Sequence, residues 1–495
     1  MSEASTTQHY VVLPAQGLRA RAPGTTPTLE HFLRSTRPGL QDLAAPGGRS
    51  LHLRVVDVIG DDGARLIEAT PADASALRTL QPSVRVVPLA YYVPAVAPRR
   101  HVAAVAPAAA AAGALTLRVV SDTDGAPVAG AIVVAFTSVA AGLGAQGTTD
   151  ERGEVVLNFR GSDVVLERLY VYPLDTYWSL RREAVALADG SEVRLRRLAL
   201  DYVDGLRHQY RNVADDHGEG VTVGVVDTGV AEHPDLVIAG GANTVAGEDP
   251  GDYGDNGLGH GTHVAGIVAA RGRPPEGIRG VAPGVSLRAY RVFGQGSGQA
   301  SSFAIAKAID QAVLDGCDLV NLSLGGGPPD PVLRAAIEDA RAAGTVCVMA
   351  AGNNSRGPVS FPASDELAVA VSALGRKGTF PDDSAEVDTV VAPYGSDEAE
   401  FIGDFSNVGP QMDLTAPGVG IISTVPGGYS EISGTSMACP AATGVAARLV
   451  AAAPDLLGAT RDAARSEAIV AALYASARDR GFPDPFEGHG LPQPC

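Results

Sequence analysis

The stretch VTVGVVDTG (221–229) decides the fold of the longest part of the chain. It is an apolar run that ends in Asp-Thr-Gly, a pattern typical of a buried strand closed by a turn. Similar apolar runs follow downstream: VSLRAYRVF, DLVNLSLGG, TVCVMAAGN and LAVAVSAL. Helical patterns lie between them: SSFAIAKAIDQAVLDG and DPVLRAAIEDARAAG. This alternation predicts an α/β fold for residues 201–495, with a mostly parallel, doubly wound sheet covered on both faces.

Four polar residues fall where functional groups collect in such a sheet. Asp227 ends the first strand, and Asn353 follows the strand VCVMAA. His260 and Ser436 each lie at the start of a helical pattern, shortly after a glycine. Because the carboxyl ends of parallel strands meet at one edge, we expect these four side chains to lie close together.

The four residue types together suit hydrolysis by an activated serine. That chemistry needs a hydroxyl nucleophile, an imidazole to take its proton, a carboxylate to orient the imidazole, and hydrogen-bond donors for the oxyanion. Each residue alone has a simpler interpretation as a turn, core or packing residue. The joint pattern therefore carries the hypothesis of a serine hydrolase.

Three blocks of sequence strengthen this hypothesis. VVDTGV (225–230), GHGTHVAG (259–266) and GTSMACP (434–440) resemble the three signature blocks of the subtilisin-like serine peptidases, in the order Asp, His, Ser. The segments GVAPGVSL, LSLGGG, AAGNN, FSNVGPQMDLTAPG and GHGL also resemble segments of that family. The resemblance covers roughly residues 221–491 and implies a subtilisin-like sheet.

The resemblance implies a role for each matching residue. Asp227 would orient the imidazole, His260 would be the general acid and base, and Ser436 would be the nucleophile. Asn353 would donate to the oxyanion. His263, the second histidine of GHGTH, matches a structural position of the family and is not the base.

The substrate-binding walls follow from the same resemblance. One wall would pair with an extended substrate backbone, and a second would face it across the pocket for the residue before the scissile bond. The first wall is Ser323, Leu324 and Gly325, and the second is Ala351 and Gly352. The family often has a glycine near the pocket base where this chain has Ser360, which predicts a somewhat smaller pocket.

Residues 1–98 form a separate small α+β segment by pattern. Alternating strand patterns occur at 50–60 and 84–93, and a helical pattern begins at Pro71. By position and length the segment resembles the propeptide of subtilisin-like peptidases, which assists folding and inhibits the site. We expect its tail, at 93–100, to lie in the substrate cleft, where cleavage would leave the next domain on the enzyme. The alternative is a permanent docking domain.

Residues 114–200 predict an antiparallel β-sandwich. A turn at Asp124-Gly125 joins two strand patterns in LTLRVVSDTDGAPVAGAIVVAFTS. The stretch TTDERGEVVLNF repeats the pattern with a turn at Arg152-Gly153, and no long helical pattern intervenes. The segment resembles transthyretin-like and carboxypeptidase-regulatory-like modules, which implies a structural or binding role without chemistry of its own. The Ala- and Pro-rich residues 99–113 predict a semi-extended linker before it.

The composition excludes some classes of binding partner. The 495 residues carry a formal net charge of −18, which argues against nucleic-acid binding because phosphate recognition needs clustered Lys and Arg. The first residues lack the basic and apolar stretches of a secretory signal. The Ala-rich run 104–115 is shorter than the ~20 apolar residues that cross a membrane. We therefore expect a soluble, cytoplasmic protein without a membrane partner.

Metal and disulfide chemistry is not expected at the site. The serine mechanism needs no cofactor, and no metal ligands are predicted. Family members often bind structural calcium through a loop after the histidine helix, but here that loop, ARGRPPEGIRGVAP (270–283), lacks Asn and Asp. The acidic stretches 252–255 and 382–388 are expected to be solvated, with cation binding as the alternative.

The four cysteines show no metal-binding spacing. They are Cys317, Cys347, Cys439 and Cys495. We expect buried free thiols, with a Cys317–Cys347 disulfide as the alternative.

The function predicted from the sequence is that of a serine endopeptidase. It would cut proteins or peptides through an acyl-enzyme and would be made as a self-inhibited zymogen, with its own N-terminal segment in the cleft. One alternative is a processing peptidase dedicated to a single partner that the sandwich recruits. Another is a catalytically silent binding protein, against which the presence of all four catalytic residue types argues.

Overall fold

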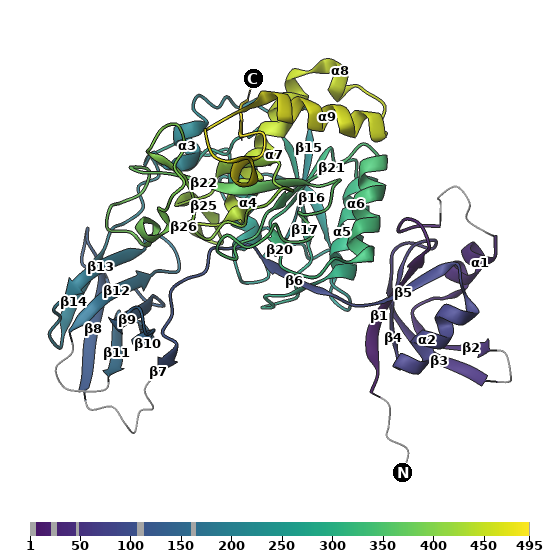
Figure 1. The fold of residues 1–495 in the computed structure, drawn as a ribbon, viewed down its shortest axis with the longest axis horizontal. Coiled ribbons are helices and arrows are strands. Elements are labelled where there is room, and N and C mark those ends of the chain that lie inside the picture. Colours follow the sequence, from purple (N-terminus) through teal and green to yellow (C-terminus); the bar gives the residue numbers. More distant parts are fainter. Residues whose placement is uncertain (1–5, 21–26, 46–48, 106–112, 160–164, 495) are drawn as a thin grey trace, which may run out of the picture.

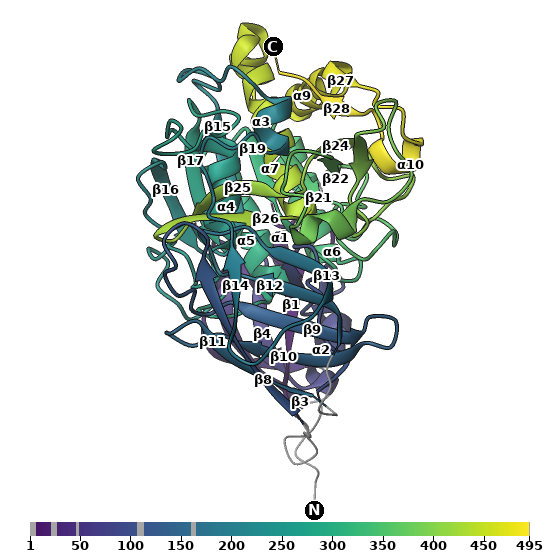
Figure 2. The ribbon, with the colours of Figure 1, turned by 90° about the vertical axis from the view of Figure 1, so that its left-hand side faces the viewer.

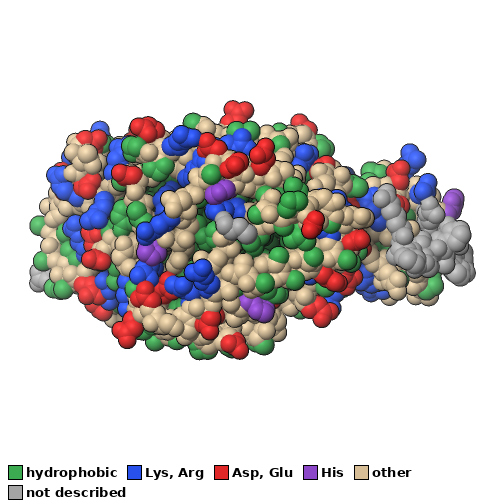
Figure 3. Space-filling view, turned by 90° about the horizontal axis from the view of Figure 1, so that it is seen from above, with side chains coloured by type: hydrophobic (Ala, Val, Ile, Leu, Met, Phe, Trp, Pro, Cys, Tyr) green, Lys and Arg blue, Asp and Glu red, His purple; other side chains and the backbone are tan. Residues whose placement is uncertain are grey.

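The computed structural model describes residues 6–20, 27–45, 49–105, 113–159 and 165–494. A central α/β unit has the N-terminal unit on one side and the β-sandwich on the other (Figure 1). The short strand β6 (Tyr91–Pro94) runs along the central unit between them. On the face seen in Figure 3, acidic and basic side chains are interspersed, so the negative net charge is not gathered there in one patch.

The central sheet is mostly parallel, as the alternation of strands and helices predicts. Its order is β16-β17-β15-β19-β21-β22-β23, with β24 beside β22, and β22 with β23 is the antiparallel pair. The strands are β15 (Thr222–Asp227), β16 (Ile238–Asn243), β17 (Ser286–Arg291), β19 (Leu319–Leu322), β21 (Val346–Ala350), β22 (Val369–Arg376), β23 (Glu400–Ile402) and β24 (Leu414–Pro417). β15 lies at the centre between β17 and β19, so its carboxyl end opens onto the middle of the sheet edge.

Helices cover both faces of this sheet. α4 (His260–Ala269) and α7 (Thr435–Ala452) share one apolar core with the sheet, and α5 (Ser302–Leu314) and α6 (Pro331–Ala342) share the other. Every residue of α4 is buried, which explains why its sequence is apolar and small all round. α6 begins where the Asp330 side chain accepts a hydrogen bond from the Val332 N–H at 2.6 Å, with a proline at the first helical position.

Smaller elements complete the central unit. The hairpin of β25 (Ile421–Val425) and β26 (Gly428–Ile432) leads directly into α7. The others are α3 (Gly205–Gln209), the 3₁₀ helix Ala385–Thr389, α8 (Pro454–Leu457), α9 (Ala463–Ser476), β27 (Ala477–Arg478), α10 (Asp484–Glu487) and β28 (Leu491–Pro492).

The N-terminal unit is a five-stranded antiparallel sheet with two helices. Its elements are β1 (Gln8–Pro14), α1 (Pro27–Ser35), β2 (Gly39–Ala45), β3 (Arg49–Val58), β4 (Arg65–Ala69), α2 (Pro71–Leu80) and β5 (Val84–Pro88). The sequence predicted the elements from β3 onward. β1, α1 and β2 lie in the polar, Pro-rich start, where none was expected. β1 takes an inner place in the sheet because its apolar run is buried from both faces.

One face of this N-terminal sheet packs against α5 and α6. Val11, Leu13 and Leu66 belong to the same apolar core as those two helices. Ion pairs reinforce the contact: the Arg19 guanidinium lies 2.6 Å from the Asp310 carboxylate, and Lys307 Nζ lies 2.7 Å from Asp57. These contacts hold the N-terminal unit against the central unit through apolar area and charge together.

The second unit consists of two packed sheets around one core. Their orders are β13-β12-β9-β10-β7 and β11-β8-β14. The strands are β7 (Ala104–Val105), β8 (Gly113–Ser121), β9 (Ile132–Ser138), β10 (Leu143–Thr148), β11 (Glu154–Phe159), β12 (Leu166–Tyr172), β13 (Leu180–Val185) and β14 (Ser191–Leu195). The prediction of a purely antiparallel sandwich is wrong at two places, because β7 pairs parallel with β10 and β14 pairs parallel with β8.

Part of the predicted linker belongs to the sandwich. Val102 is buried among Phe136, Tyr170 and Tyr172, and residues 104–105 form β7. Residues 106–112 of that linker lie outside the described residues. The Ala- and Pro-rich composition did not predict this packing, because Val102 is the residue of the stretch that belongs to the apolar cluster.

The sandwich docks tightly on the β25–β26 hairpin, which lies next to it in Figure 2. Trp178 of the sandwich is 1% exposed and belongs to the core of the central unit, where its ring packs 5.1 Å from that of Tyr202. The Thr176 N–H donates to the Tyr429 carbonyl at 2.8 Å, and the Arg181 N–H donates to the Asp383 carbonyl at 2.7 Å. A buried aromatic anchor with backbone hydrogen bonds around it fixes the sandwich beside the helix that carries Ser436.

Cys317, Cys347 and Cys439 are buried and free, so the alternative Cys317–Cys347 disulfide is wrong. Burial raises the pKa of Cys317 to about 11 and that of Cys347 to about 12, and it also raises the pKa of Cys439. Cys495 lies outside the described residues. Within the described ranges, no helix has the length and apolar character needed to cross a membrane.

Candidate active site

Asp227 and His260 form a buried pair. Asp227 is the last residue of β15 and His260 the first of α4, and His260 Nδ1 lies 2.7 Å from Asp227 Oδ1. The Thr228 N–H donates to the same carboxylate oxygen at 2.7 Å. A Cβ on Gly261 would come within 2.3 Å of the Gly229 carbonyl, so the helix start can approach the strand end only with glycine there.

Ser436 lies in the first turn of α7. Its hydroxyl donates to the Ser323 carbonyl at 2.9 Å, and the Ser323 hydroxyl donates back to the Ser436 carbonyl at 2.9 Å. His260 Nε2 is buried without a hydrogen-bond partner among the described residues. The structure thus joins Asp227 to His260 and leaves the Ser436 hydroxyl on a backbone carbonyl.

Asn353 follows β21 and faces the start of α7. Its Oδ1 accepts a hydrogen bond from the Thr435 N–H at 3.0 Å, and its Nδ2 is buried without a partner among the described residues. The Gly352 N–H donates to Thr435 Oγ1 at 3.1 Å and holds the same turn. A buried N–H without an acceptor is costly to folding, so such a group is a sign of a ligand-binding role.

A segment of the chain itself lies across this site. β6 pairs antiparallel with β18 (Ala300–Ser301) on one side and with β20 (Leu324–Gly325) on the other. The next residue, Ala95, donates its N–H to the Ser323 carbonyl at 3.1 Å. Of the residues expected to pair with an extended backbone, Ser323, Leu324 and Gly325 all contact this segment through their main chain.

The peptide bond between Ala95 and Val96 lies beside Ser436. The Ser436 N–H donates to the Ala95 carbonyl oxygen at 3.1 Å, and the Ala97 N–H donates to the Ser433 carbonyl at 2.9 Å. A Cβ on Gly434 would lie 2.7 Å from the Ala95 oxygen, so glycine there lets the segment approach. The carbonyl of Ala95 thus accepts a hydrogen bond from the backbone of the residue that the sequence predicts as the nucleophile.

The second expected wall contacts Ser360, whose N–H donates to the Ala351 carbonyl at 2.9 Å. Ala351 and Gly352 directly follow β21, and a Cβ on Gly352 would lie 2.5 Å from both Ser360 Oγ and Asn407 Nδ2. Asn407 Nδ2 donates to Ser360 Oγ at 2.9 Å and fixes its orientation. A Cβ on Gly325, in the opposite wall, would lie 3.7 Å from Ser360 Cβ. Ser360 is thus held between the two walls, where it takes up space that glycine would leave open.

Tyr92 occupies a pocket that the sequence did not predict. Its side chain is 1% exposed, and its hydroxyl donates to the Pro328 carbonyl at 3.0 Å. Phe361 packs against the ring at 6.3 Å, and a Cβ on Gly327 would come within 2.4 Å of the ring. The run of three glycines at 325–327 was the available signal, because such a run leaves space beside the strand.

His263 is a structural residue, as the sequence predicted. Its Nε2 lies 3.1 Å from the carbonyls of Ile421 and Ser430, both of the hairpin that precedes α7. Burial lowers its pKa to about 3, so the ring stays neutral near pH 7 and acts as a donor to the hairpin.

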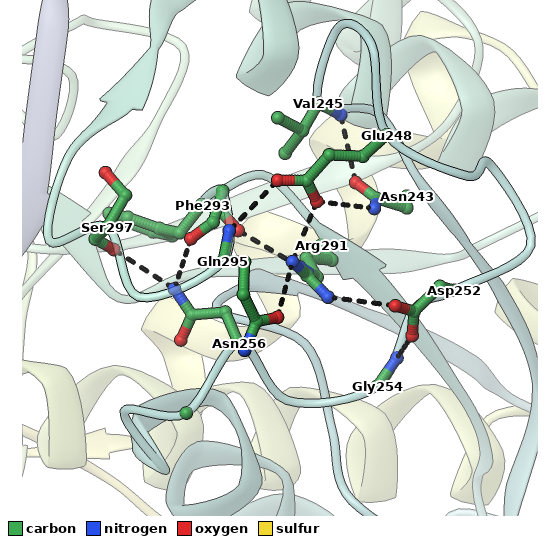
Figure 4. Close-up of polar contacts among 12 residues, drawn as sticks. Asn243, Val245, Glu248, Asp252, Gly254, Asn256, Arg291, Phe293, Gln295 and Ser297 are labelled. Carbon is green, nitrogen blue, oxygen red and sulfur yellow. Dashed lines mark hydrogen bonds and ion pairs between the residues drawn. The ribbon is translucent and has the colours of Figure 1, made fainter.

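An arginine holds the acidic loop before His260 (Figure 4). The buried Arg291 guanidinium lies 2.7 Å from Glu248 and 3.3 Å from Asp252. In the same network Asn256 Nδ2 donates to the Gly294 and Ser297 carbonyls at 2.9 and 3.0 Å. Asp252 is exposed as expected, yet its carboxylate already pairs with the guanidinium of Arg291. Among the described residues, no group of three or more His, Cys, Asp and Glu side chains is placed to hold a metal ion.

Comparison with known proteins identifies the family to which the chain is similar. The family model described as the subtilase family matches residues 218–490. The chain is 38% identical over 245 residues to subtilisin DY of Bacillus licheniformis, covering 48% of this chain and 80% of that protein. It is 40% identical over 232 residues to subtilisin Savinase of Lederbergia lenta, covering 46% and 76%. It is equally identical to M-protease of Shouchella clausii over 232 residues, covering 46% and 54%.

These matches and the fold define a serine endopeptidase, a hydrolase of peptide bonds. The chain belongs to the subtilase family. The family match begins at residue 218, so it does not extend to the N-terminal unit or the sandwich.

Proposed function

We propose that Asp227, His260 and Ser436 are the catalytic triad and that Asn353 completes the oxyanion hole. The observation that carries the proposal is the hydrogen bond from the Ser436 N–H to the Ala95 carbonyl oxygen. A peptide carbonyl polarised by the backbone N–H of a serine is the arrangement from which that serine attacks. Protein and peptide substrates would bind as β6 does, as a strand between β18 and β20.

The proton transfers follow from the contacts. With Asp227 as the acceptor, His260 carries its proton on Nδ1, which leaves Nε2 free to accept a proton. The Ser436 hydroxyl turns from the Ser323 carbonyl to Nε2, loses its proton and attacks the substrate carbonyl. The Ser436 N–H and Asn353 Nδ2–H then stabilise the oxyanion. His260 returns the proton to the leaving amine, and water hydrolyses the acyl-enzyme by the same steps.

We further propose that the protein is a zymogen whose first substrate is its own Ala95–Val96 bond. The N-terminal unit would act as a propeptide, held by its contacts with α5 and α6 and by β6 in the cleft. After cleavage the sandwich would stay on the enzyme, because it follows residue 96 and its Trp178 is anchored in the core of the central unit.

Self-processing can be tested with wild type beside Ser436→Ala. Wild type should yield a fragment whose first residue is Val96, identified by N-terminal sequencing, and Ser436→Ala should remain at full length. If both stay at full length, self-processing is wrong. Labelling with a fluorophosphonate separates this outcome from loss of catalysis, since folded wild type that takes no label is not an active serine peptidase.

A further inference from the structure

The residues after the Ala95–Val96 bond lead from the site onto the sandwich. The Arg100 N–H donates to the Tyr172 hydroxyl at 3.2 Å, and the Val102 N–H donates to Gln146 Oε1 at 3.1 Å. Val102 is buried in the sandwich, and β7 pairs with β10 just beyond it. Two units therefore build the side of the cleft that receives the leaving group. The central unit contributes the residues after the β25–β26 hairpin, and the sandwich contributes the rest.

An aromatic platform of the sandwich faces this segment. The rings of Tyr172 and Tyr170 stack nearly parallel with their centres 5.9 Å apart, and the Arg99 guanidinium lies 5.4 Å from the centre of the Tyr172 ring. The Tyr170 hydroxyl donates to Asp388 of the central unit. Arg181 Nε lies 2.5 Å from the same carboxylate, so Asp388 fixes the platform to the central unit and is itself neutralised.

Carboxyl groups without a cationic partner line the same region. A cavity of about 320 Å³ lies between residues 96–101, the tyrosine platform and the central unit. Glu386, Glu431 and Asp404 line this cavity, and none of them forms an ion pair among the described residues. Burial raises the pKa of Asp404, and the nearby Arg100 charge opposes that rise. The segment that presents Arg99, Arg100 and His101 thus lies against a surface with three carboxyl groups outside any ion pair of the described residues, next to the paired Asp388.

We propose that the sandwich is a substrate-binding domain that selects basic residues on the leaving-group side of the scissile bond. Tyr172 would bind an Arg or Lys at the fourth position after that bond, and Asp404 would attract one at the fifth, as they now do with Arg99 and Arg100. The proposal rests on the proposed function, because it takes Ala95–Val96 as the scissile bond. Cation–π and carboxylate contacts both favour a guanidinium or ammonium group over an acidic side chain.

The chain's own segment occupies this surface until a substrate replaces it. The segment is buried in the sandwich only from Val102 onward, while the side chains of Arg99 and Arg100 are exposed. An external peptide therefore competes with residues 96–101, and its selection depends on binding. Exposed charges are screened by salt, so the preference weakens as ionic strength rises.

The test compares two internally quenched peptides on the self-processed protein. One copies residues 91–101, YYVPAVAPRRH, and the other has Glu at both Arg positions. We expect the basic peptide to have a kcat/KM about tenfold higher, mainly through KM, with the ratio shrinking in high salt. Tyr172→Leu and Asp404→Asn should each reduce the ratio. Asp189→Asn, which changes an exposed carboxylate on the turn before β14, is the matched control that keeps it.

A third substrate, Tyr-Val-Pro-Ala-p-nitroanilide, separates the possible failures. It has no residues after the scissile bond and therefore reports catalysis alone. If wild type cleaves it but cuts the two quenched peptides equally well, the binding role of the sandwich is wrong and the proposed function stands. If the folded protein cleaves none of the three, both proposals fail. Asp404→Asn removes a charge without removing bulk, so it remains informative if Tyr172→Leu does not fold.

Discussion

The backbone N–H of Ser436 and the carbonyl oxygen of Ala95 are 3.1 Å apart from nitrogen to oxygen, within a hydrogen bond. Residue 95 belongs to the segment that follows the N-terminal unit, and residue 436 lies in the first turn of the helix that crosses the central core. This one contact aligns the preceding strand with β20 and the following residues with the sandwich.

Asn353 should matter to the chemical step more than to binding. Asn353→Asp keeps an oxygen that accepts from the Thr435 N–H but removes the Nδ2 donor and adds a negative charge. Loss of one oxyanion donor lowers kcat by ~100-fold or more with little change in KM. Steady-state kinetics on a p-nitroanilide substrate would show this. Activity close to wild type would mean that Nδ2 donates to nothing in the transition state.

Ser360 should limit the size of the residue that precedes the scissile bond. Its side chain is fixed by Asn407 between Gly325 and Gly352, and the bound segment has only Ala95 at that position. Ser360→Gly should raise kcat/KM for Phe and Leu relative to Ala by about tenfold, the usual worth of a methylene or two in a pocket. Matched peptides that differ only at this residue measure the ratio. An unchanged ratio would place the limit elsewhere.

Much of the fold followed from local pattern. The strand runs and helical periods predicted the α/β unit, and the rule that polar groups gather at one sheet edge brought Asp227 and His260 together. That rule works because it depends on topology, which short sequence patterns encode well. The rule gives no information on side-chain rotamers. It therefore could not predict that the Ser436 hydroxyl donates to the Ser323 carbonyl and not to His260.

Contacts between units could not be predicted in this way. Trp178 follows Tyr177 in the connection between two short strands, and no periodic pattern there indicates that it enters the core of another unit. Tyr92 lies in the short apolar run LAYYV (89–93), and Val102 is flanked by Pro- and Ala-rich sequence. Their burial depends on surfaces supplied by residues far away in the chain, which periodicity does not report.

Trp178 should anchor the sandwich. Trp178→Ala removes a side chain that is 1% exposed and packs on Tyr202, which costs ~3–5 kcal/mol for a large aromatic group. Val156→Ala is the matched control, because Val156 is an apolar residue of the sandwich that is 55% exposed. Chemical denaturation should show the loss for Trp178→Ala only, together with easier proteolysis between the two units. Equal stability of the two variants would contradict the anchor.

His263 should make the protein sensitive to acid. Its folded pKa of about 3 lies below its ordinary value of 6.5, so the unfolded chain binds a proton in this range that the folded protein does not. Stability is therefore complete above pH 6.5 and falls as the pH drops toward 3, by up to ~1.4 kcal/mol per pH unit. His263→Asn should be less stable at pH 7 but lose this slope, with the exposed His31→Asn as control. A slope that survives in His263→Asn would assign it to other groups.

Glu431 should act in the opposite direction. Burial and the neighbouring Glu386 raise its pKa well above 4.5, so the folded protein keeps a proton that the unfolded chain has already lost. Its contribution to stability is complete below pH 4.5 and declines as the pH rises through the folded pKa. The Ser179 N–H donates to Glu431 at 3.1 Å, and the Ser179 hydroxyl donates to Glu386 at 2.9 Å. Loss of the proton from Glu431 therefore weakens the contact of the sandwich, which contains Ser179, with the central unit. Glu431→Gln should flatten this decline in unfolding measured from pH 4 to 9, and an unaltered decline would exclude the pair as its source.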